Sequence, residues 1–399
     1  MKHLFRNGRI IDGLGGVIEN GWVLVKQGRI EALGRGTTTA TEGREEAEVV
    51  NLEGKSLLPG LIDCHVHLVL DGGPDPMTRV VDAPDAEAVL GMAANGMRTL
   101  KAGITTVRDL GSKNFVDVHL RNAVETGLVQ GPRMSCSGQM ICITGGHGSQ
   151  MGCVADGPDG VRRAVRLQAG SGADWIKLMA TGGVLTRGGV PGMPHFNPDE
   201  LRAGVEEAHK LRLRTSAHSQ SLAGTRNAVH AGIDSVEHGV GLDEEIVEEM
   251  AERGTFLVPT LSAPANIIAR GEEAGIPAEF VDKTRRLFDE HVAGFRLAAE
   301  AGVKIAMGTD AGTPFNFHGE NARELLLMAE HGLPAGEVLR CATSVGAELL
   351  GMEEIAGSVA VGRWADFVVV DGNPLEDLSV LATPERLFAV FRAGVRVDR

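Results

Sequence analysis

Residues 59–69 read PGLIDCHVHLV, an apolar run that carries two histidines, His65 and His67, near its end. A run of this length and composition predicts a buried strand. Because residues two apart in a strand point to the same side, both imidazoles face one point. The segment therefore predicts a strand that ends in a pair of metal-type ligands. An exposed or hydrogen-bonded histidine pair is the alternative that this segment alone leaves open.

Outward from this segment, residues 59–356 alternate short apolar runs with amphipathic helical stretches, as parallel strands with crossover helices do. Nearly every expected helix ends in glycine, which tolerates the left-handed closing conformation. The expected strands are residues 61–69, 104–111, 132–139, 174–181, 214–219, 235–239, 255–261 and 304–311. Eight β/α units in about 300 residues match a closed (β/α)8 TIM barrel. The alternative, an open doubly wound sheet, lacks its glycine-rich phosphate loop after the first strand.

Both ends of the chain consist of short alternating apolar runs broken by Asn-Gly, Gln-Gly and other glycine turns. This pattern is typical of hairpins. Neither end alone buries both faces of a sheet, so we expect the termini to meet in one small β domain. The predicted fold is of the α/β class: a composite β-sandwich of residues 1–58 and 357–399, which encloses a catalytic barrel of residues 59–356.

The amino-acid composition argues against some classes of binding partner. The 399 residues include 39 Lys plus Arg against 53 Asp plus Glu, a formal net charge of −14, which would repel a nucleic-acid backbone. We find no stretch of roughly 18 apolar residues that would cross a bilayer, and no secretory signal pattern at the N-terminus. Five dispersed cysteines without a CxxC pair favour small buried hydrophobes. We therefore expect a cytoplasmic protein with neither nucleic acid nor membrane as a partner.

Four further ligand-type residues stand in, or at the carboxyl end of, expected barrel strands: Lys177, His218, His238 and Asp310. That end is where barrel active sites are built. Each residue alone has a plainer interpretation, as a capping aspartate, a core histidine or a lysine that reaches out of the barrel. Six such residues at the same end of five apolar strands favour a metal centre, because burying them unpaired would cost several kcal/mol.

Lys177 is the most informative of the six. An ammonium ion buried beside two metal cations is electrostatically untenable, because burial and like charge both favour the neutral amine. A neutral amine can add carbon dioxide to become a carbamate, whose two oxygens are able to bridge two metals. We therefore expect Lys177 to be an N6-carboxylysine.

Taken together, several motifs resemble the metal-dependent amidohydrolase superfamily: PGLIDCHVH, IKLMATGG, SAHS, SVEHG, GTDAG, ATSVGAELLG and GSVAVGRWADFVVVDGNPLED. The resemblance covers almost the whole chain. It is greatest for the branch of Xaa-Pro dipeptidases (prolidase-like enzymes), L-Xaa-L-Arg/Lys dipeptidases and the fungal amidase that cleaves ochratoxin.

This resemblance implies two divalent metal ions as cofactors. The implied ligands are His65, His67 and Asp310 for the more buried ion, His218 and His238 for the other, and carboxylated Lys177 as the bridge. Zinc suits imidazole and carboxylate ligands best, while manganese, cobalt and iron stay open.

The implied reaction is cleavage of an amide bond of a dipeptide or N-acyl amino acid by a metal-bridging hydroxide. The more exposed ion polarises the scissile carbonyl, and Asp310 passes a proton to the departing amine. The same centre also suits another amide, including ochratoxin-like ones, a carbamate, a lactone or an ester. A deaminase or cyclic-amide hydrolase is a further alternative, against which the bridging Lys177 argues. A barrel retained only for assembly is the non-enzymatic alternative.

Substrate contacts are expected from the loops. His147, in ICITGGHGSQMG, resembles a segment of the prolidase-like branch that contacts the substrate α-carboxylate, and Gln220 stands where that branch often has Tyr. Arg187, in a loop with His195, is placed to pair with an acidic substrate group, or else is a solvated loop arginine. Residues 263–280 are either a lid or an exposed helical excursion. Close relatives imply a homo-oligomer.

Overall fold

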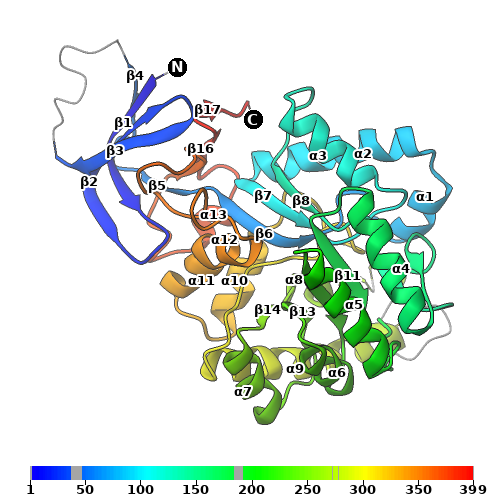
Figure 1. Ribbon diagram of the computed structural model, residues 1–399. Helices are drawn as coiled ribbons and strands as arrows, with labels where there is room; N and C mark the ends of the chain where they lie inside the picture. The colour runs from blue at the N-terminus through cyan, green and yellow to red at the C-terminus, as the bar shows by residue number, and fades with distance from the viewer. Residues whose placement is uncertain (1, 37–46, 184–191, 272, 277, 399) are drawn as a thin grey trace. The chain divides into compact units, whose positions relative to one another are not determined.

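The computed structural model of the protein describes residues 2–36, 47–183, 192–271, 273–276 and 278–398. The proximity of Cα atoms divides the chain into two compact units (Figure 1). Unit 1 comprises Met1–Asp63, Met97–Thr106 and Gly319–Arg399, and unit 2 comprises Cys64–Gly96 and Val107–His318. The domain boundaries predicted above, at residues 58/59 and 356/357, stay a prediction.

Unit 1 contains an eight-stranded sheet, in the order β17-β16-β15-β5-β1-β2-β3 with β4 paired to β1. Its strands are β1 (Lys2–Ile11), β2 (Val17–Lys26), β3 (Arg29–Arg35), β4 (Glu48–Asn51), β5 (Ser56–Pro59), β15 (Phe367–Val370), β16 (Leu387–Arg392) and β17 (Val395–Arg396). Strand β5 is parallel to β1 and antiparallel to β15, with Leu57 opposite Val369. Strands from the two ends of the chain therefore share one sheet, while a sandwich of two layers stays a prediction.

Three phenylalanines join these strands. The ring of Phe5 on β1 lies 5.3 Å from the ring of Phe367 on β15 and 4.8 Å from that of Phe391 on β16, measured between centroids and both edge to face. Aromatic pairs favour this geometry. All three side chains belong to one buried apolar cluster, so the N-terminal and C-terminal strands share a core. The helices of unit 1 that follow residue 319 are α10 (Arg323–Glu330), α11 (Ala335–Cys341), α12 (Ser344–Leu350) and α13 (Ser379–Ala382).

Strands and helices alternate through the middle of the chain. The strands are β6 (Leu61–Val66), β7 (Ile104–Asp109), β8 (Arg133–Cys136), β9 (Ile141–Cys142), β10 (Cys153–Val154), β11 (Trp175–Met179), β12 (Arg214–Ser219), β13 (Ser235–His238) and β14 (Phe256–Val258). The helices are α1 (Pro76–Asp82), α2 (Asp85–Lys101), α3 (Val116–Glu125), α4 (Gly157–Gly170), α5 (Pro198–Lys210), α6 (Leu222–Ala231), α7 (Glu244–Arg253), α8 (Ser262–Arg270) and α9 (Ala278–Glu300). Among the described residues, no helix combines the length and apolar character needed to cross a membrane.

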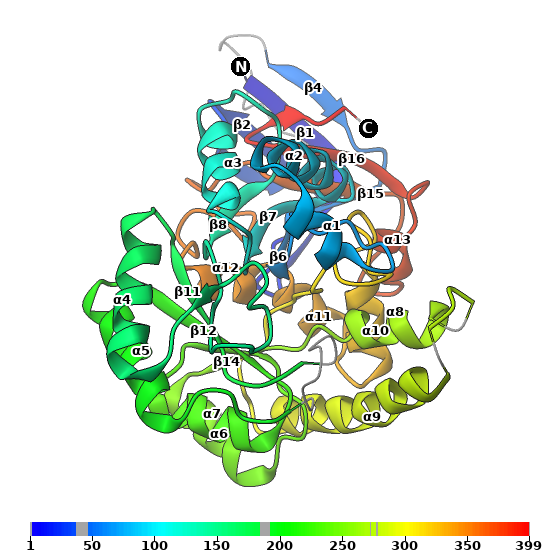
Figure 2. The ribbon, with the colours of Figure 1, turned by 90° about the vertical axis from the view of Figure 1, so that its right-hand side faces the viewer.

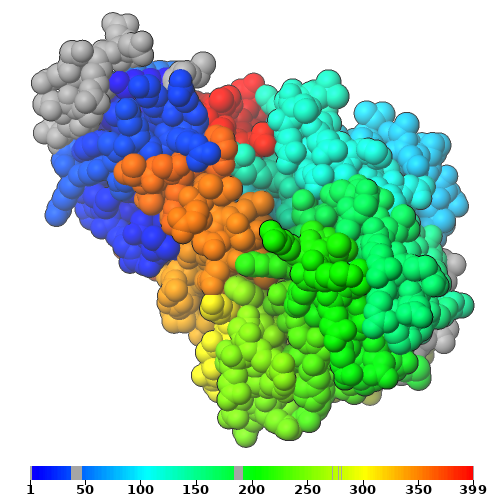
Figure 3. All heavy atoms as spheres, in the orientation of Figure 1, coloured from blue at the N-terminus to red at the C-terminus, as the bar shows by residue number. Residues whose placement is uncertain are grey.

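The strands of this region lie in two sheets. One has the order β10-β9-β11-β12-β13-β14 and the other the order β6-β7-β8. Strands β11 to β14 are mutually parallel, and helices α5, α6 and α7 connect them in turn. Helices α4 to α7 lie on the outside of these strands in Figure 2, and their green segments form a large part of the surface seen in Figure 3. The predicted α/β character with crossover helices is therefore confirmed.

Helix ends follow the chemistry of their residues. Helix α6 begins after Ser221 and α7 after Asp243, and each of these side chains accepts a hydrogen bond from a backbone N–H of the first turn. Such capping satisfies a donor that has no partner within the helix. The two helices end at Gly232 and Gly254, whose φ angles of 90° and 72° are left-handed. Glycine adopts this conformation at little cost, which explains why the helices stop there.

Seven of the eight expected strand segments contain a strand, but residues 304–311, all of them described, contain none. Single parallel bridges join Ile305 to Leu257 on β14 and Ala311 to Val66 on β6. Asp310, near the end of this segment, takes a left-handed φ of 58°. The expectation of a regular eighth strand is therefore wrong. The two sheets are not joined by named strands, and a closed barrel stays a prediction.

Replacing Phe5 by Ala should lower the free energy of unfolding of unit 1 by about 3–5 kcal/mol, because the cavity left among the three rings cannot collapse fully. Urea unfolding followed by circular dichroism measures this change. Val17 on β2 is 42% exposed, so Val17→Ala serves as a control that should change stability by less than about 0.5 kcal/mol. Equal effects of the two substitutions would show that the aromatic cluster does not hold unit 1 together.

Candidate metal centre

The six residues predicted as metal ligands line a single cavity in unit 2. They come from the ends of neighbouring strands: His65 on β6 and His67 just beyond it, Lys177 on β11, His218 on β12, His238 on β13, and Asp310 from residues 304–311. Carboxyl ends of parallel strands meet at one edge of a sheet, which brings residues distant in sequence together. All six side chains are largely buried, including the Lys177 side chain at 1% exposed.

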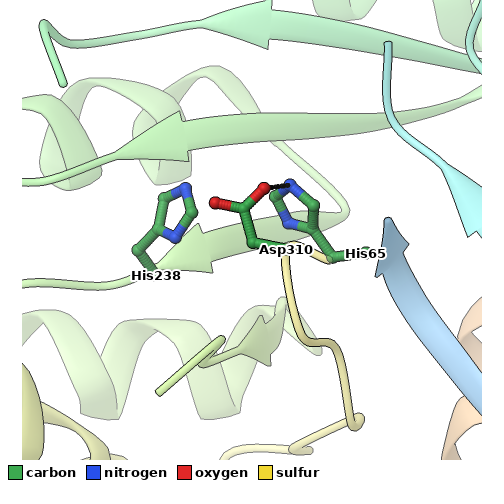
Figure 4. Close-up of side chains that lie close together, drawn as sticks. All are labelled: His65, His238 and Asp310. Carbon is green, nitrogen blue, oxygen red and sulfur yellow. Dashed lines mark ion pairs between the residues drawn. The ribbon is translucent and has the colours of Figure 1, made fainter. Parts of the chain in front are cut away.

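Asp310 lies at the centre of one half of the site. Its Oδ1 atom is 3.4 Å from Nε2 of His65 and 3.3 Å from Nε2 of His67. His65, His238 and Asp310 each offer a ligand atom within 4.8 Å of the others, and Figure 4 shows the carboxylate between the two rings. Ligand atoms about 2.1 Å from a tetrahedral zinc are about 3.4 Å apart, so this spacing fits a metal ion.

The tautomers of the first two histidines are set by their outer neighbours. Nδ1 of His65 lies 2.8 Å from Oε2 of Glu237, and Nδ1 of His67 lies 3.0 Å from the carbonyl oxygen of Gly111. A carboxylate and a carbonyl only accept hydrogen bonds, so each Nδ1 must carry the proton and donate it. Each Nε2 then keeps a lone pair on the side of Asp310, as a metal ligand requires.

His238 is oriented by a hydroxyl group. Its Nδ1 atom lies 2.6 Å from Oγ1 of Thr260, which itself donates a hydrogen bond of 2.6 Å to the carbonyl of Pro259. Because the Thr260 proton is used in that bond, Nδ1 of His238 is the donor and Nε2 bears the lone pair. This Nε2 faces Nδ1 of His218 at 2.8 Å. This contact is a hydrogen bond in which Nδ1 of His218 donates to the Nε2 lone pair, so Nε2 of His218 carries a lone pair of its own.

Among the six predicted ligands, two buried nitrogens have no hydrogen-bond partner in the described part of the chain: Nζ of Lys177 and Nε2 of His218. Leaving buried polar atoms unsatisfied is costly. Burial lowers the pKa of Lys177 to about 8, although the charges of Glu237 and Asp310 act in the opposite direction. A carbamate on Lys177 with metal ions beside it would turn the unsatisfied amine into a ligand. The donor set present here therefore fits a metal centre.

The imidazoles of the site are neutral at ordinary pH. Burial, assisted by the charge of Lys177, lowers the pKa of His65 to about 3. Burial also lowers the pKa of His67 to about 4 and drives those of His218 and His238 well below their ordinary value. Only neutral imidazole binds a metal, so protons do not compete with an ion for these histidines near neutral pH.

Three residues of the site have strained backbones. His238, Thr260 and Asp310 take left-handed φ angles of 70°, 54° and 58°. Such angles are uncommon for residues other than glycine and cost on the order of 1–3 kcal/mol each. They persist where the surrounding packing over-determines them, and they gather at functional sites. Here the left-handed angles of these three residues direct their side chains toward the predicted metal ligands.

Two of the three predicted substrate-binding residues lie in the part of the chain that the structure describes. His147 lines the same cavity, with its ring 4.7 Å from that of His218, and its backbone N–H donates to Nδ1 of His195 at 3.4 Å. Burial lowers the pKa of His147 to about 3, so it is also neutral. Gln220 lines the cavity as well. Arg187 lies outside the described residues.

The empty space of the cavity and its open mouth together is about 1020 Å³, and the wall is largely apolar. Four methionines contribute to the wall: Met77, Met140, Met151 and Met179. Residues 263–280, left open above as a lid or an excursion, supply Ala263, Pro264 and Ile267 from α8, and α9 supplies Leu287 and Phe288. Apart from the site residues above, the described lining carries no charged side chain. The parts of a bound molecule that lie away from the predicted metal ligands would therefore contact apolar side chains.

Two charged residues behind the site, Arg108 on β7 and Glu237 on β13, were not predicted from the sequence. Both are fully buried, and Glu237 contacts His65 directly. The available signal was a charged residue inside a short apolar strand, in ITTVRD and SVEH. Such residues are almost never fully buried unless they are paired.

Comparison with known proteins places this geometry in a family. Residues 56–397 match the model of a protein family described as "Amidohydrolase family". The chain belongs to the amidohydrolase family. Ochratoxinase of Aspergillus niger is 33% identical over 369 residues, which cover 85% of this chain and 75% of that protein. The family predicted from the motifs is confirmed.

Two solved structures are similar over the whole of both chains. One is a Xaa-Pro dipeptidase with bound methionine in its active site, 32% identical with a TM-score of 0.90. The other is a prolidase complexed with N-methylphosphonate-L-proline, 33% identical with a TM-score of 0.91. These neighbours agree with a prolidase-like branch of the amidohydrolases. The protein is accordingly a hydrolase of C–N bonds.

Metal-free protein should lose stability as the pH falls from 7 to 5. In the unfolded chain a histidine takes up a proton below its ordinary pKa of 6.5, whereas folded His65 and His67 stay neutral down to about 3 and 4. The unfolded state therefore binds more protons in this range, and each histidine removes about 2 kcal/mol at pH 5. Thermal melting of chelator-treated protein at several pH values measures the loss. A His67→Asn variant should lose less, and an equal loss would contradict this account.

Proposed function

We propose that the protein is a binuclear metal-dependent amidohydrolase that cleaves the amide bond of a dipeptide or an N-acyl amino acid. The observation that carries the proposal is the Lys177 amine, buried in one cavity with four histidines and an aspartate. A neutral amine in that place is chemically useful as a carbamate, because a carbamate is an anion that bridges two cations. A site for one ion would need no lysine.

In this proposal the ligands are those implied by the motifs: His65, His67 and Asp310 for one ion, His218 and His238 for the other, and N6-carboxylated Lys177 for both. Two divalent ions, zinc by preference, supply an activated water and a Lewis acid for the scissile carbonyl when they are bound. The tautomers described above support this assignment, since Nε2 of His65, His67 and His238 each present a lone pair.

Asp310 is proposed to move the proton. Its side chain remains 14% exposed, more than that of any of the four histidines, and it lines the cavity. The carboxylate can therefore accept a proton from the attacking water and pass it to the departing amine. We propose that His147 and Gln220, which line the same cavity, donate hydrogen bonds to a substrate carbonyl or carboxylate. The apolar wall excludes bulk water from this exchange.

The apolar wall of the cavity favours substrates with apolar side chains. A dipeptide or N-acyl amino acid with a large apolar side chain would bury that group against the methionines and the residues of α8 and α9. A charged side chain would lose its hydration there without a partner among the described lining residues. The neighbours bind methionine and an N-phosphonyl proline, which are ligands of similar size. Ochratoxin-like amides are the alternative within the same class.

For the fold, we propose a closed (β/α)8 barrel of residues 59–356 with a β-sandwich of residues 1–58 and 357–399. Two contacts support closure within unit 2. The bridges of Ile305 and Ala311 lie between β14 and β6, and the backbone N–H of Asp174 donates to the carbonyl of Cys136 at the end of β8. We also propose a cytoplasmic homo-oligomer that binds neither nucleic acid nor membrane.

Lys177→Ala should reduce the bound metal from two ions to one or none per chain, because the bridging carbamate is lost. Elemental analysis of protein purified in bicarbonate buffer measures the metal content, and hydrolysis of an N-acyl amino acid measures activity. Acetate or propionate should restore part of the activity by supplying a carboxylate in place of the side chain. Lys210→Ala, on an exposed helical side chain, is the control and should keep both ions. Full occupancy and normal turnover in Lys177→Ala would refute the carbamate.

A panel of L-Xaa-L-Xaa dipeptides and N-acetyl amino acids tests the substrate. We expect kcat/KM to be at least about 10-fold higher for Phe, Met or Leu than for Asp or Lys at the same position. Phe288→Ala should reduce this preference by raising KM for the apolar substrates with little effect on kcat. A preference for charged side chains would refute the apolar site. Activity on esters or lactones alone would instead refute the amide substrate.

A further inference from the structure

Arg108 and Glu237 form a charged pair that does not line the cavity. Both side chains are fully buried in unit 2, at 0% exposure. Ser216, which donates to Glu237, lies on the same face of β12 as His218, two residues before it. The pair therefore lies one layer beneath the cavity-lining histidines.

The guanidinium of Arg108 is held by every group around it. Nε donates to the carbonyl of Cys64 at 2.6 Å, one terminal nitrogen to Oγ of Ser235 at 3.0 Å, and the other to Oε1 of Glu237 at 2.8 Å. The group also stacks on the ring of Trp175, 4.4 Å from its centroid. These partners belong to β6, β11 and β13, so one cation ties three strands to β7. These contacts hold the Arg108 guanidinium in one orientation.

The carboxylate of Glu237 is oriented in the same way. Its Oε1 atom accepts three hydrogen bonds, from Arg108, from Ser216 at 2.8 Å and from Ser235 at 2.7 Å. Its Oε2 atom accepts the fourth, from Nδ1 of His65 at 2.8 Å. Three donors on Oε1 fix the plane of the carboxylate, and this leaves Oε2 aimed at the imidazole.

The charge of Glu237 is also secured. A terminal nitrogen of Arg108 lies 2.8 Å from Oε1, and Ser216 and Ser235 donate to the same oxygen, so every neighbour of Oε1 suits an ionised carboxylate. An ionised carboxylate only accepts hydrogen bonds, so the proton of His65 must reside on Nδ1. Nε2 of His65 is then left with its lone pair.

Stability alone does not explain such a pair. Replacing a buried ion pair by apolar side chains of similar volume is often neutral or stabilising. We infer that Arg108 and Glu237 are positioning residues, which hold His65 in the tautomer and orientation that bind a divalent cation through Nε2. The inference rests on the proposed metal role of His65, and it adds two residues that touch neither substrate nor metal.

Glu237→Gln tests the inference with a minimal change of shape. The three donors keep the amide oxygen in the place of Oε1, so the amide NH2 faces Nδ1 of His65. Two donors cannot meet, and His65 must move its proton to Nε2, the ligand atom. Two results are expected in the variant: the 15N imidazole shifts of metal-free, histidine-labelled protein report an Nε2-protonated His65, and Zn²⁺ affinity by chelator competition falls about 10- to 100-fold.

Glu237→Gln removes the counter-charge of Arg108, which could prevent folding, so a second variant is needed. Arg108→Met with Glu237→Met removes both charges, should melt within a few degrees of the wild type, and should show the same loss of Zn²⁺ affinity. Co²⁺-loaded protein should also show altered visible absorption bands. The matched control is Glu207→Gln, which breaks the bidentate ion pair of Arg166 and Glu207 between α4 and α5 and should leave Zn²⁺ affinity unchanged.

The outcomes are distinguishable. Wild-type Zn²⁺ affinity in either folded Glu237 variant, or an unchanged His65 tautomer in Glu237→Gln, overturns the inference and leaves the proposed function intact. Failure of both variants to fold also overturns it, because the pair would then serve folding. A wild-type protein that binds no divalent ion refutes the proposed function itself.

Discussion

Four imidazoles and one lysine amine share a buried space in which a proton on any ligand atom would repel its neighbours and block a cation. The surrounding structure removes those protons. Burial lowers the pKa values of Lys177 and the histidines. The protons that must remain on His65, His67 and His238 are drawn to outer acceptors: a carboxylate, a carbonyl and a hydroxyl. The chemistry proposed for the site depends on this separation of lone pairs from protons.

The irregular backbone near Asp310 belongs to the same arrangement. The N–H groups of Thr309 and Asp310 both donate to the carbonyl of His65, and the left-handed turn at Asp310 directs the carboxylate to the histidines. Gly308 permits this approach, since a Cβ atom there would lie 2.3 Å from Val258 and 2.9 Å from Cβ of His65. The left-handed turn and the close approach at Gly308 together place the carboxylate beside the histidines.

Charge is concentrated at one end of the cavity. The ligand-type residues and their buried neighbours lie at the strand ends, while helices α8 and α9 and the four methionines supply apolar wall. Flexible methionine side chains adapt to irregular ligands, which suits a site that selects by size and apolarity.

The sequence by itself determined the elements with local causes. Apolar runs predicted strands such as β6 and β12, and glycines predicted helix ends, because these signals act within a few residues. It also supplied the ligand-type residues, His65 to Asp310, although not their geometry. Only the tertiary structure decided the interruption at residues 304–311 and the pairing of Arg108, Glu237 and His65. Those contacts join residues 129 and 172 positions apart, and no local pattern encodes which distant acceptor a buried histidine will meet.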